Sequence, residues 1–161
     1  MLSKNIKSTL AGKFITPVKN LLLQGTSPRL IAIAIAGAAV LGIVPVIGST
    51  TLLCTIFALS LRLNIPLVQL VNFSVYPLQV IMIIPFMKMG EYIFGIESLN
   101  YSLDDIYRLV TGDILNAISV LWNVTLQGIG AWAISAPILF SLIYFPLYAI
   151  LRKFERIRVK N

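Results

Sequence analysis

The chain has 161 residues, of which 58% are hydrophobic and 12% are charged. A soluble domain is typically about 45–50% apolar and about 25% charged, so this composition excludes an ordinary soluble fold of this size. No Lys, Arg, Asp or Glu occurs in 30–61, 63–87 or 114–151. Uncharged apolar runs of about 18 residues or more are typical of membrane helices, so the sequence predicts an all-α, polytopic membrane protein.

The residue types that carry most catalytic and metal chemistry are scarce. The chain contains no histidine, which is a common general base and metal ligand, and a single cysteine, Cys54. Cys54 is expected to pack as a small apolar residue. The six acidic residues show no catalytic or metal-ligand spacing. We therefore expect no catalytic residue, no metal and no cofactor, and we predict that the protein is not an enzyme.

Residues 1–29 form a basic N-terminal segment that contains five Lys or Arg residues and no acid. Apolar residues recur every four positions from Leu2 to Leu22, which favours a helix in the membrane interface, held by anionic headgroups. Pro17 interrupts that pattern, and the alternative is a frayed basic tail.

The uncharged run 30–61 is too long for one straight crossing. As a single helix it would measure about 48 Å, against a hydrocarbon core of about 30 Å. Pro45 and Gly48 supply a break, and Ser49 or Thr50 can cap the helix that follows.

The two halves, 30–44 and 49–61, are each about 20 Å long, which is short for a membrane crossing. Arg29 and Arg62 flank the pair, so both ends are expected on one face of the membrane. The sequence therefore predicts a proline-broken, re-entrant helical hairpin whose tip, 44–51, should not face lipid. The alternative is a tilted pair of short spans with the tip at the far headgroups.

The run 63–87 has two interpretations. Pro77 near its middle predicts either one kinked span or a second re-entrant hairpin, 65–76 and 78–89. Polar side chains in this run could line a polar path or act as interhelical hydrogen-bonding groups, and these are Gln69, Asn72 and Gln79.

Residues 88–113 resemble a soluble segment, and a serine cap predicts a short helix at 103–111 within a polar loop. The final uncharged run, 114–151, would be about 57 Å long as one helix. A turn is predicted at Gly128 and Gly130, which would separate a half-length helix 114–127 from a span 131–151. The basic tail, 152–161, follows, and the candidates for anchoring at the interface are Trp122, Trp132, Tyr144 and Tyr148.

Charge also predicts topology. Both termini and Arg62 should be cytoplasmic by the positive-inside bias, in a bacterial cytoplasmic membrane. The loop 88–113 is then external if 63–87 crosses once, and internal if 63–87 re-enters. The net charge of +7 belongs to residues that flank apolar runs, so no nucleic-acid partner is expected.

Several short motifs occur between residues 25 and 95. In chain order they are Gly-Thr-Ser-Pro at 25–28, Gly-Ile-Val-Pro-Val-Ile-Gly at 42–48 and Leu-Arg-Leu-Asn-Ile-Pro at 61–66, followed by a proline-centred segment and Gly90. In combination they resemble the bacterial membrane family catalogued as domain of unknown function twenty sixty-two.

That resemblance implies a helical protein that is integral to the membrane. No biochemical activity is assigned to the family, and some of its members are joined to glycosyltransferases of polyprenyl-phosphate sugar pathways. The chain departs from the family pattern in three places. Ser49-Thr50-Thr51 replaces a glutamine-threonine sequence, Tyr76 replaces an asparagine before Pro77, and 114–151 is longer than usual. No catalytic residue can be transferred from the family.

Two functional hypotheses follow. The first is a transporter-like protein or one that handles lipid or polyprenyl-phosphate cargo, because broken helices at membrane depth expose backbone groups to cargo. The second is a non-catalytic structural or accessory subunit of a membrane complex, for example with a glycosyltransferase. Expected partners are the lipid bilayer, lipid-linked phosphate cargo, and either further copies of the chain or another membrane protein. The candidate binding residues are Pro45, Gly48, Ser49, Thr50, Arg62, Asn64, Asn72 and Pro77.

Overall fold

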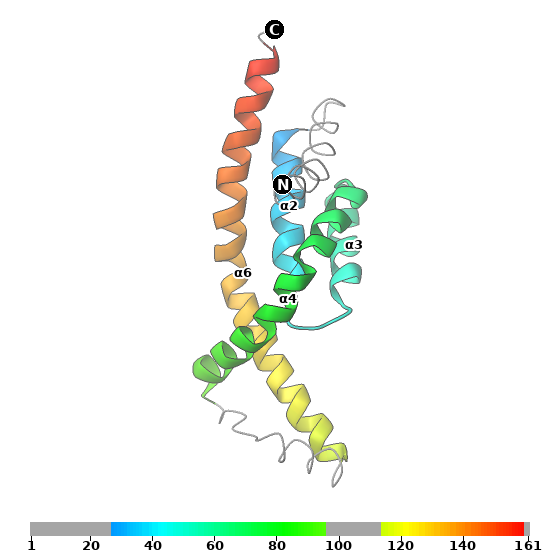
Figure 1. Ribbon diagram of the computed structural model, residues 1–161, viewed down its shortest axis with the longest axis vertical. Coiled ribbons are helices and arrows are strands. Elements are labelled where there is room, and N and C mark those ends of the chain that lie inside the picture. The colour runs from blue at the N-terminus through cyan, green and yellow to red at the C-terminus, as the bar shows by residue number, and fades with distance from the viewer. Residues whose placement is uncertain (1–26, 96–113, 160–161) are drawn as a thin grey trace, which may run out of the picture.

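The fold of the chain is described by a computed structural model for residues 27–95 and 114–159, and all its regular elements there are α-helices (Figure 1). The helices are α2 (Pro28–Gly42), α3 (Thr50–Ser60), α4 (Ile65–Phe94) and α6 (Ile114–Val159). The predicted all-α class is therefore confirmed for this part of the chain. The segment 1–26 and the helix predicted at 103–111 lie outside the described residues.

The first two helices form an antiparallel pair. Helix α2 begins at Pro28, with Ser27 as its N-cap accepting a hydrogen bond from the Leu30 amide at 3.4 Å. It ends at Gly42, two residues before the end expected from the sequence, and the chain turns through residues 43–49 into α3. Gly48 has φ of +88°, a left-handed conformation that glycine adopts at little cost.

Helix α2 lies between its neighbours, with α6 on one side and α3 and α4 on the other (Figure 1). Its alternate alanines point to different faces of the helix, and all four are at most 1% exposed: Ala32, Ala34, Ala36 and Ala38. Small side chains on several faces allow several helices to approach α2 closely. Gly37 shows the same effect, because a Cβ atom there would overlap the ring of Phe57 in α3.

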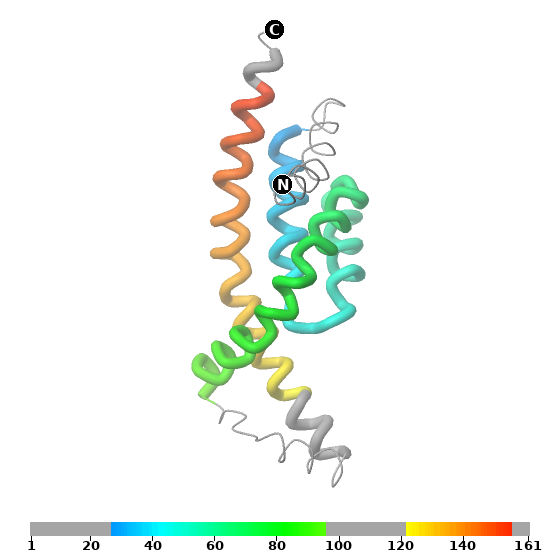
Figure 2. The backbone as a smooth tube through the Cα atoms, viewed as in Figure 1, coloured from blue at the N-terminus to red at the C-terminus, as the bar shows by residue number. Residues whose placement is uncertain are grey.

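The helix α4 is a single element, so the re-entrant alternative for 63–87 is wrong and the continuous form is observed. It contains Pro77 and Pro85 and extends to Phe94, which makes 88–94 helical rather than part of a loop. A proline removes one hydrogen bond but ends a helix only if nothing else supports the next turn. Figure 2 shows that the axis of α4 is not straight as it crosses α2 and α6.

The helix α6 also continues where the sequence predicted a turn. Gly128 and Gly130 lie inside it, and the helix extends through Val159, so the start of the basic tail is helical. Gly130 allows close packing instead, because a Cβ atom there would lie 2.7 Å from the ring of Phe94 in α4. Figure 1 shows that the yellow first part of α6 is inclined to its orange and red remainder.

The order of the helices places four helix ends together. The first residues of α2 and α4 and the last residues of α3 and α6 lie at one end of the molecule (Figure 1). Buried side chains join them there, since Ile31, Leu63, Leu67 and Leu151 belong to one hydrophobic cluster. Lys88 and Glu91 lie near the end of α4, at the opposite end of the molecule.

Candidate functional site

The turn between α2 and α3 is closed by a side chain from α4. Gln79 is fully buried, and its Nε2 donates to the carbonyl oxygens of Val44 at 2.8 Å and Val46 at 3.3 Å. Both acceptors lie outside a helix, and each also accepts a hydrogen bond within the turn, from the Val46 amide at 2.7 Å and the Ser49 amide at 3.4 Å respectively. Its Oε1 is buried and has no hydrogen-bond partner among the described residues. Gln79 therefore stabilises an irregular backbone segment from the neighbouring helix.

The last turn of α2 likewise accepts a hydrogen bond from a side chain of α6. The amide of Val44 bonds to Leu41 at 3.3 Å and not to Val40, which leaves the Val40 carbonyl without its usual helical partner. The indole Nε1 of Trp132 donates to that carbonyl oxygen at 3.0 Å. The prediction that Trp132 anchors the protein at the interface is therefore corrected: its polar atom bonds within the helix bundle.

The predicted binding residues of the turn take different positions. Pro45 is buried and lies against Gly128 of α6, whereas Gly48 is exposed. The hydroxyl of Ser49 donates to the Val46 carbonyl oxygen at 2.9 Å and makes no capping bond to α3, and Thr50 is only 3% exposed. The tip is thus partly covered, and its exposed side includes Ile47, which is 60% exposed.

A second polar group connects α4 to α3. The Nε2 of Gln69 donates to the Thr51 carbonyl oxygen at 3.1 Å and to the Thr55 hydroxyl oxygen at 2.8 Å. The Nδ2 of Asn72, a 3% exposed residue, donates to the Gln69 Oε1 at 3.2 Å. Gln69 therefore acts as an interhelical hydrogen-bonding group, and Asn72 supports it from the same helix. This is the structural interpretation of the two that the sequence allowed.

Pro77 does not join this group. It is exposed on α4, and its side chain takes part in none of the hydrogen bonds that hold the turn.

Sequence reasoning missed the contact of Gln79 with the turn, although the spacing of Gln79 from Asn72 could have indicated it. Asn72 and Gln79 are seven residues apart, which is about two helical turns, so both side chains lie on one face of α4.

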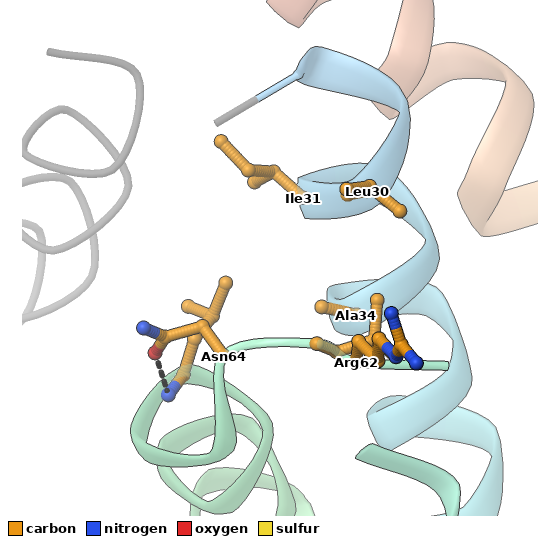
Figure 3. A pocket seen from close by; sticks show the side chains of 7 residues that line it. Leu30, Ile31, Ala34, Arg62 and Asn64 are labelled. Carbon is orange, nitrogen blue, oxygen red and sulfur yellow. Dashed lines mark hydrogen bonds between the residues drawn. The ribbon is translucent and has the colours of Figure 1, made fainter. Parts of the chain in front are cut away.

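Arg62 and Asn64 line a separate, small pocket at the other end of the hairpin (Figure 3). Its floor is apolar, its volume is about 30 Å³, and its remaining lining residues are Leu30, Ile31, Ala34, Leu63 and Leu67. One water molecule needs about 10–15 Å³ on this measure, so the pocket has room for about two waters and encloses no sugar or prenyl chain.

The polar groups of that pocket point in different directions. The Oδ1 of Asn64 accepts from the Leu67 amide at 2.9 Å, so the side chain caps α4. Arg62 has φ of +52°, and Figure 3 shows its guanidinium beside α2, turned away from the Asn64 amide. Arg62 and Asn64, both candidate binding residues, therefore share a pocket without converging on one point. Along α4, Gln79 lies roughly 25 Å from Arg62, so the candidate residues form two groups.

Most of the described cations gather at one end of the fold, and an uncharged stretch of α4 follows. Arg29, Arg62, Arg152 and Lys153 lie, all exposed, at the end that contains the first residues of α2 and α4. Before Lys88 no residue of α4 is charged, over roughly 35 Å of helix. Within residues 27–95 and 114–159, two helices are long and apolar enough to cross a membrane, by length and composition: Ile65–Phe94 and Trp122–Glu155.

Comparison with known proteins gives one match. The profile of a family described as "Uncharacterized protein conserved in bacteria (DUF2062)" matches residues 13–160. No curated protein and no solved structure shows significant similarity to the chain. The match extends well beyond the motifs at 25–95 and includes the C-terminal helix. The chain therefore belongs to the bacterial DUF2062 family, as its sequence motifs predicted.

Proposed function

We propose that the protein is integral to the bacterial cytoplasmic membrane, crosses it with α4 and α6, and inserts α2 and α3 as a re-entrant hairpin. The outward-facing side chains of the helices support this proposal. Apolar residues between a third and two thirds exposed occur along three helices, including Ile56 of α3, Ile81 of α4 and Leu142 of α6. Such a surface is favourable in lipid and costly in water.

The length of the hairpin supports the re-entrant form. Helices α2 and α3 contain 15 and 11 residues, which corresponds to about 22 Å and 16 Å. Gln79, which contacts the turn, lies roughly 13 Å along α4 before Lys88. If the basic end lies at the cytoplasmic surface, the tip stops inside a hydrocarbon core of about 30 Å. Both termini are then cytoplasmic, and the segment after α4 is external.

We propose further that the protein is a non-catalytic accessory subunit of a membrane complex. The observation that carries this is the hydrogen bonding of Gln69, Asn72 and Gln79. Polar groups that line a transport path face water or cargo, whereas the amide nitrogens of these three bond to the hairpin or to one another. The described pocket at Arg62 does not extend to Ser49, Thr50 or Asn72.

The accessory role also explains the exposed side of the tip. Irregular backbone at membrane depth is tolerated when protein or a water-filled cavity covers it. Ile47 and Gly48 are exposed in the single chain, and so is the adjoining outer face of α3, with Leu52 at 64%. A partner protein over this face, either another copy or a different subunit, would remove the backbone of the tip from lipid.

Site-specific photocrosslinking in native membranes tests the accessory role. A photoreactive amino acid at Ile47 or Leu52 is expected to give one discrete protein adduct, identified by mass spectrometry. The same probe at Ile138 or Leu142 of α6, which are 62% and 66% exposed, is the matched control and should react with lipid. Lipid adducts alone at all four positions would contradict the accessory role.

The alternative is a transporter-like protein that handles lipid-linked phosphate. The concentration of cations at one end favours it, because phosphate headgroups bind Arg and Lys. Purified protein in vesicles should then move a fluorescent polyprenyl phosphate between leaflets faster than protein-free vesicles do. Under the accessory proposal the two rates are equal.

A further inference from the structure

The charged groups of the described chain are strongly asymmetric. Arg29, Arg62, Arg152 and Lys153 gather at one end, where Glu155 is the only described acid. The opposite end has Lys88 and Glu91, whose formal charges cancel. Counted over residues 27–95 and 114–155, the formal charge of the first end is 4 − 1 = +3, and that of the second is 1 − 1 = 0.

The basic end also has an apolar recess beside a cation. Arg62 is exposed, while the pocket that it lines is formed by aliphatic side chains of α2 and α4, among them Leu30 and Leu67 (Figure 3). Leu67 is 3% exposed and Leu30 is 39% exposed, so the recess leads from the core to the outer surface. Below it, α4 continues for more than five turns without a charge.

This combination matches a phospholipid better than a soluble anion. A phospholipid carries a phosphate next to its acyl chains, and the protein presents a guanidinium next to an aliphatic recess. Free phosphate would need several donors that converge on one point. Here the Asn64 amide caps α4 and points away from the Arg62 guanidinium.

We infer that the basic end is an interaction surface for anionic phospholipid headgroups, with Arg62 at its centre and Arg29, Arg152 and Lys153 around it. The inference rests on the proposed membrane placement and adds a lipid class to it. Each Lys or Arg near an anionic membrane surface contributes about 1 kcal/mol, so loss of Arg62 should reduce the preference for anionic lipid about fivefold.

The test uses the full chain, purified in detergent and reconstituted in equimolar phosphatidylglycerol and phosphatidylethanolamine. Native mass spectrometry gives the ratio of the two lipids retained by the protein. Wild type should retain phosphatidylglycerol preferentially, and Arg62→Gln should lower that ratio about fivefold. Lys88→Gln removes the same charge at the other end and is expected to leave the ratio unchanged.

Two further variants keep the test decisive if Arg62→Gln folds poorly. Arg62→Lys retains the charge and should keep most of the preference, while Arg29→Gln should lower it from a different helix. Equal losses from Arg62→Gln and Lys88→Gln, or no preference in the wild type, would overturn the inference. So would full displacement of the retained lipid by millimolar inorganic phosphate, because the surface would then bind the free anion.

Failure of this inference differs from failure of the membrane placement. A chain that stays in the membrane pellet after alkaline carbonate washing, but shows no lipid preference, contradicts the lipid surface alone. A chain released by the wash contradicts the membrane placement, and with it the lipid surface.

Discussion

At the scale of single residues, two side chains from other helices donate hydrogen bonds to carbonyl groups at and after the end of α2. Trp132 bonds to Val40, and Gln79 bonds to Val44 and Val46. A buried carbonyl without a partner costs about 1–3 kcal/mol in proteins generally, and interhelical bonds inside membranes average about 0.6 kcal/mol. The shape of the turn therefore depends on residues that are distant in sequence.

Gln79→Leu should destabilise the hairpin, because it removes the hydrogen bonds from α4 to two loop carbonyls and keeps a similar side-chain volume. We expect a loss of about 1–2 kcal/mol in the free energy of unfolding, measured by denaturant titration in mild detergent. Ser74→Ala is the control, since the hydroxyl of Ser74 bonds only within α4, to the Leu70 carbonyl oxygen. Equal stability of Gln79→Leu and wild type would contradict the assigned role.

At the scale of the helices, glycine sets how closely α4 and α6 approach each other. A Cβ atom on Gly90 would lie 2.5 Å from the carbonyl oxygen of Gln127, a backbone atom that cannot move independently of α6. A Cβ atom on Gly128 would lie 3.5 Å from Met87 and from Pro45, which is an ordinary van der Waals distance. The two glycines therefore differ in what a methyl group would cost.

Gly90→Ala should push α4 away from α6 and cost about 1–3 kcal/mol of stability, as overpacked substitutions do. Gly128→Ala should be neutral or stabilising by up to about 1 kcal/mol, because alanine is the better helix former. Thermal unfolding of both variants in one detergent gives the comparison. Equal melting temperatures for the two would contradict the close approach of α4 to α6 at Gly90.

Helix boundaries were predictable from the sequence in one place and not in another. The sequence predicts the break at Pro45 and Gly48, because helix length and proline position together require a turn there. The predicted boundaries are near Val44 and Ser49. In the structure, α2 ends at Gly42 and α3 begins at Thr50. Gly128 and Gly130 were misread as a turn. A glycine that allows close packing and a glycine that ends a helix look alike until the neighbouring helix is known.

The candidate site was less predictable than the helices. Polar residues in an apolar run indicate hydrogen bonding, but they do not identify the partner. Gln69 and Asn72 could have faced a polar path, and only the position of α3 decides that they bond within the bundle. Arg62 and Asn64 are close in sequence, yet the capping bond of Asn64 turns its amide away. Residue spacing alone does not show whether a side chain caps its own helix or faces a neighbouring residue.

At the scale of the whole molecule, the fold separates a basic end from a weakly charged end by a band of apolar helix. We interpret this band as the membrane region and the turn after α2 as a re-entrant tip inside it. Three positions report on that arrangement. Leu61 is 48% exposed at the basic end, Ile47 is 60% exposed at the tip, and Tyr92 is 91% exposed near the far end of α4.

Single-cysteine labelling at these three positions tests the central claim most directly. Cys54 is fully buried, so Cys54→Ala provides a cysteine-free background with little change in packing. A membrane-impermeant maleimide should label Leu61→Cys only from the cytoplasmic side and Tyr92→Cys only from the outside of intact cells. Ile47→Cys should react from neither side until the membrane is dissolved in denaturant. Labelling of Ile47→Cys from outside, or of all three positions from one side, would contradict the re-entrant hairpin.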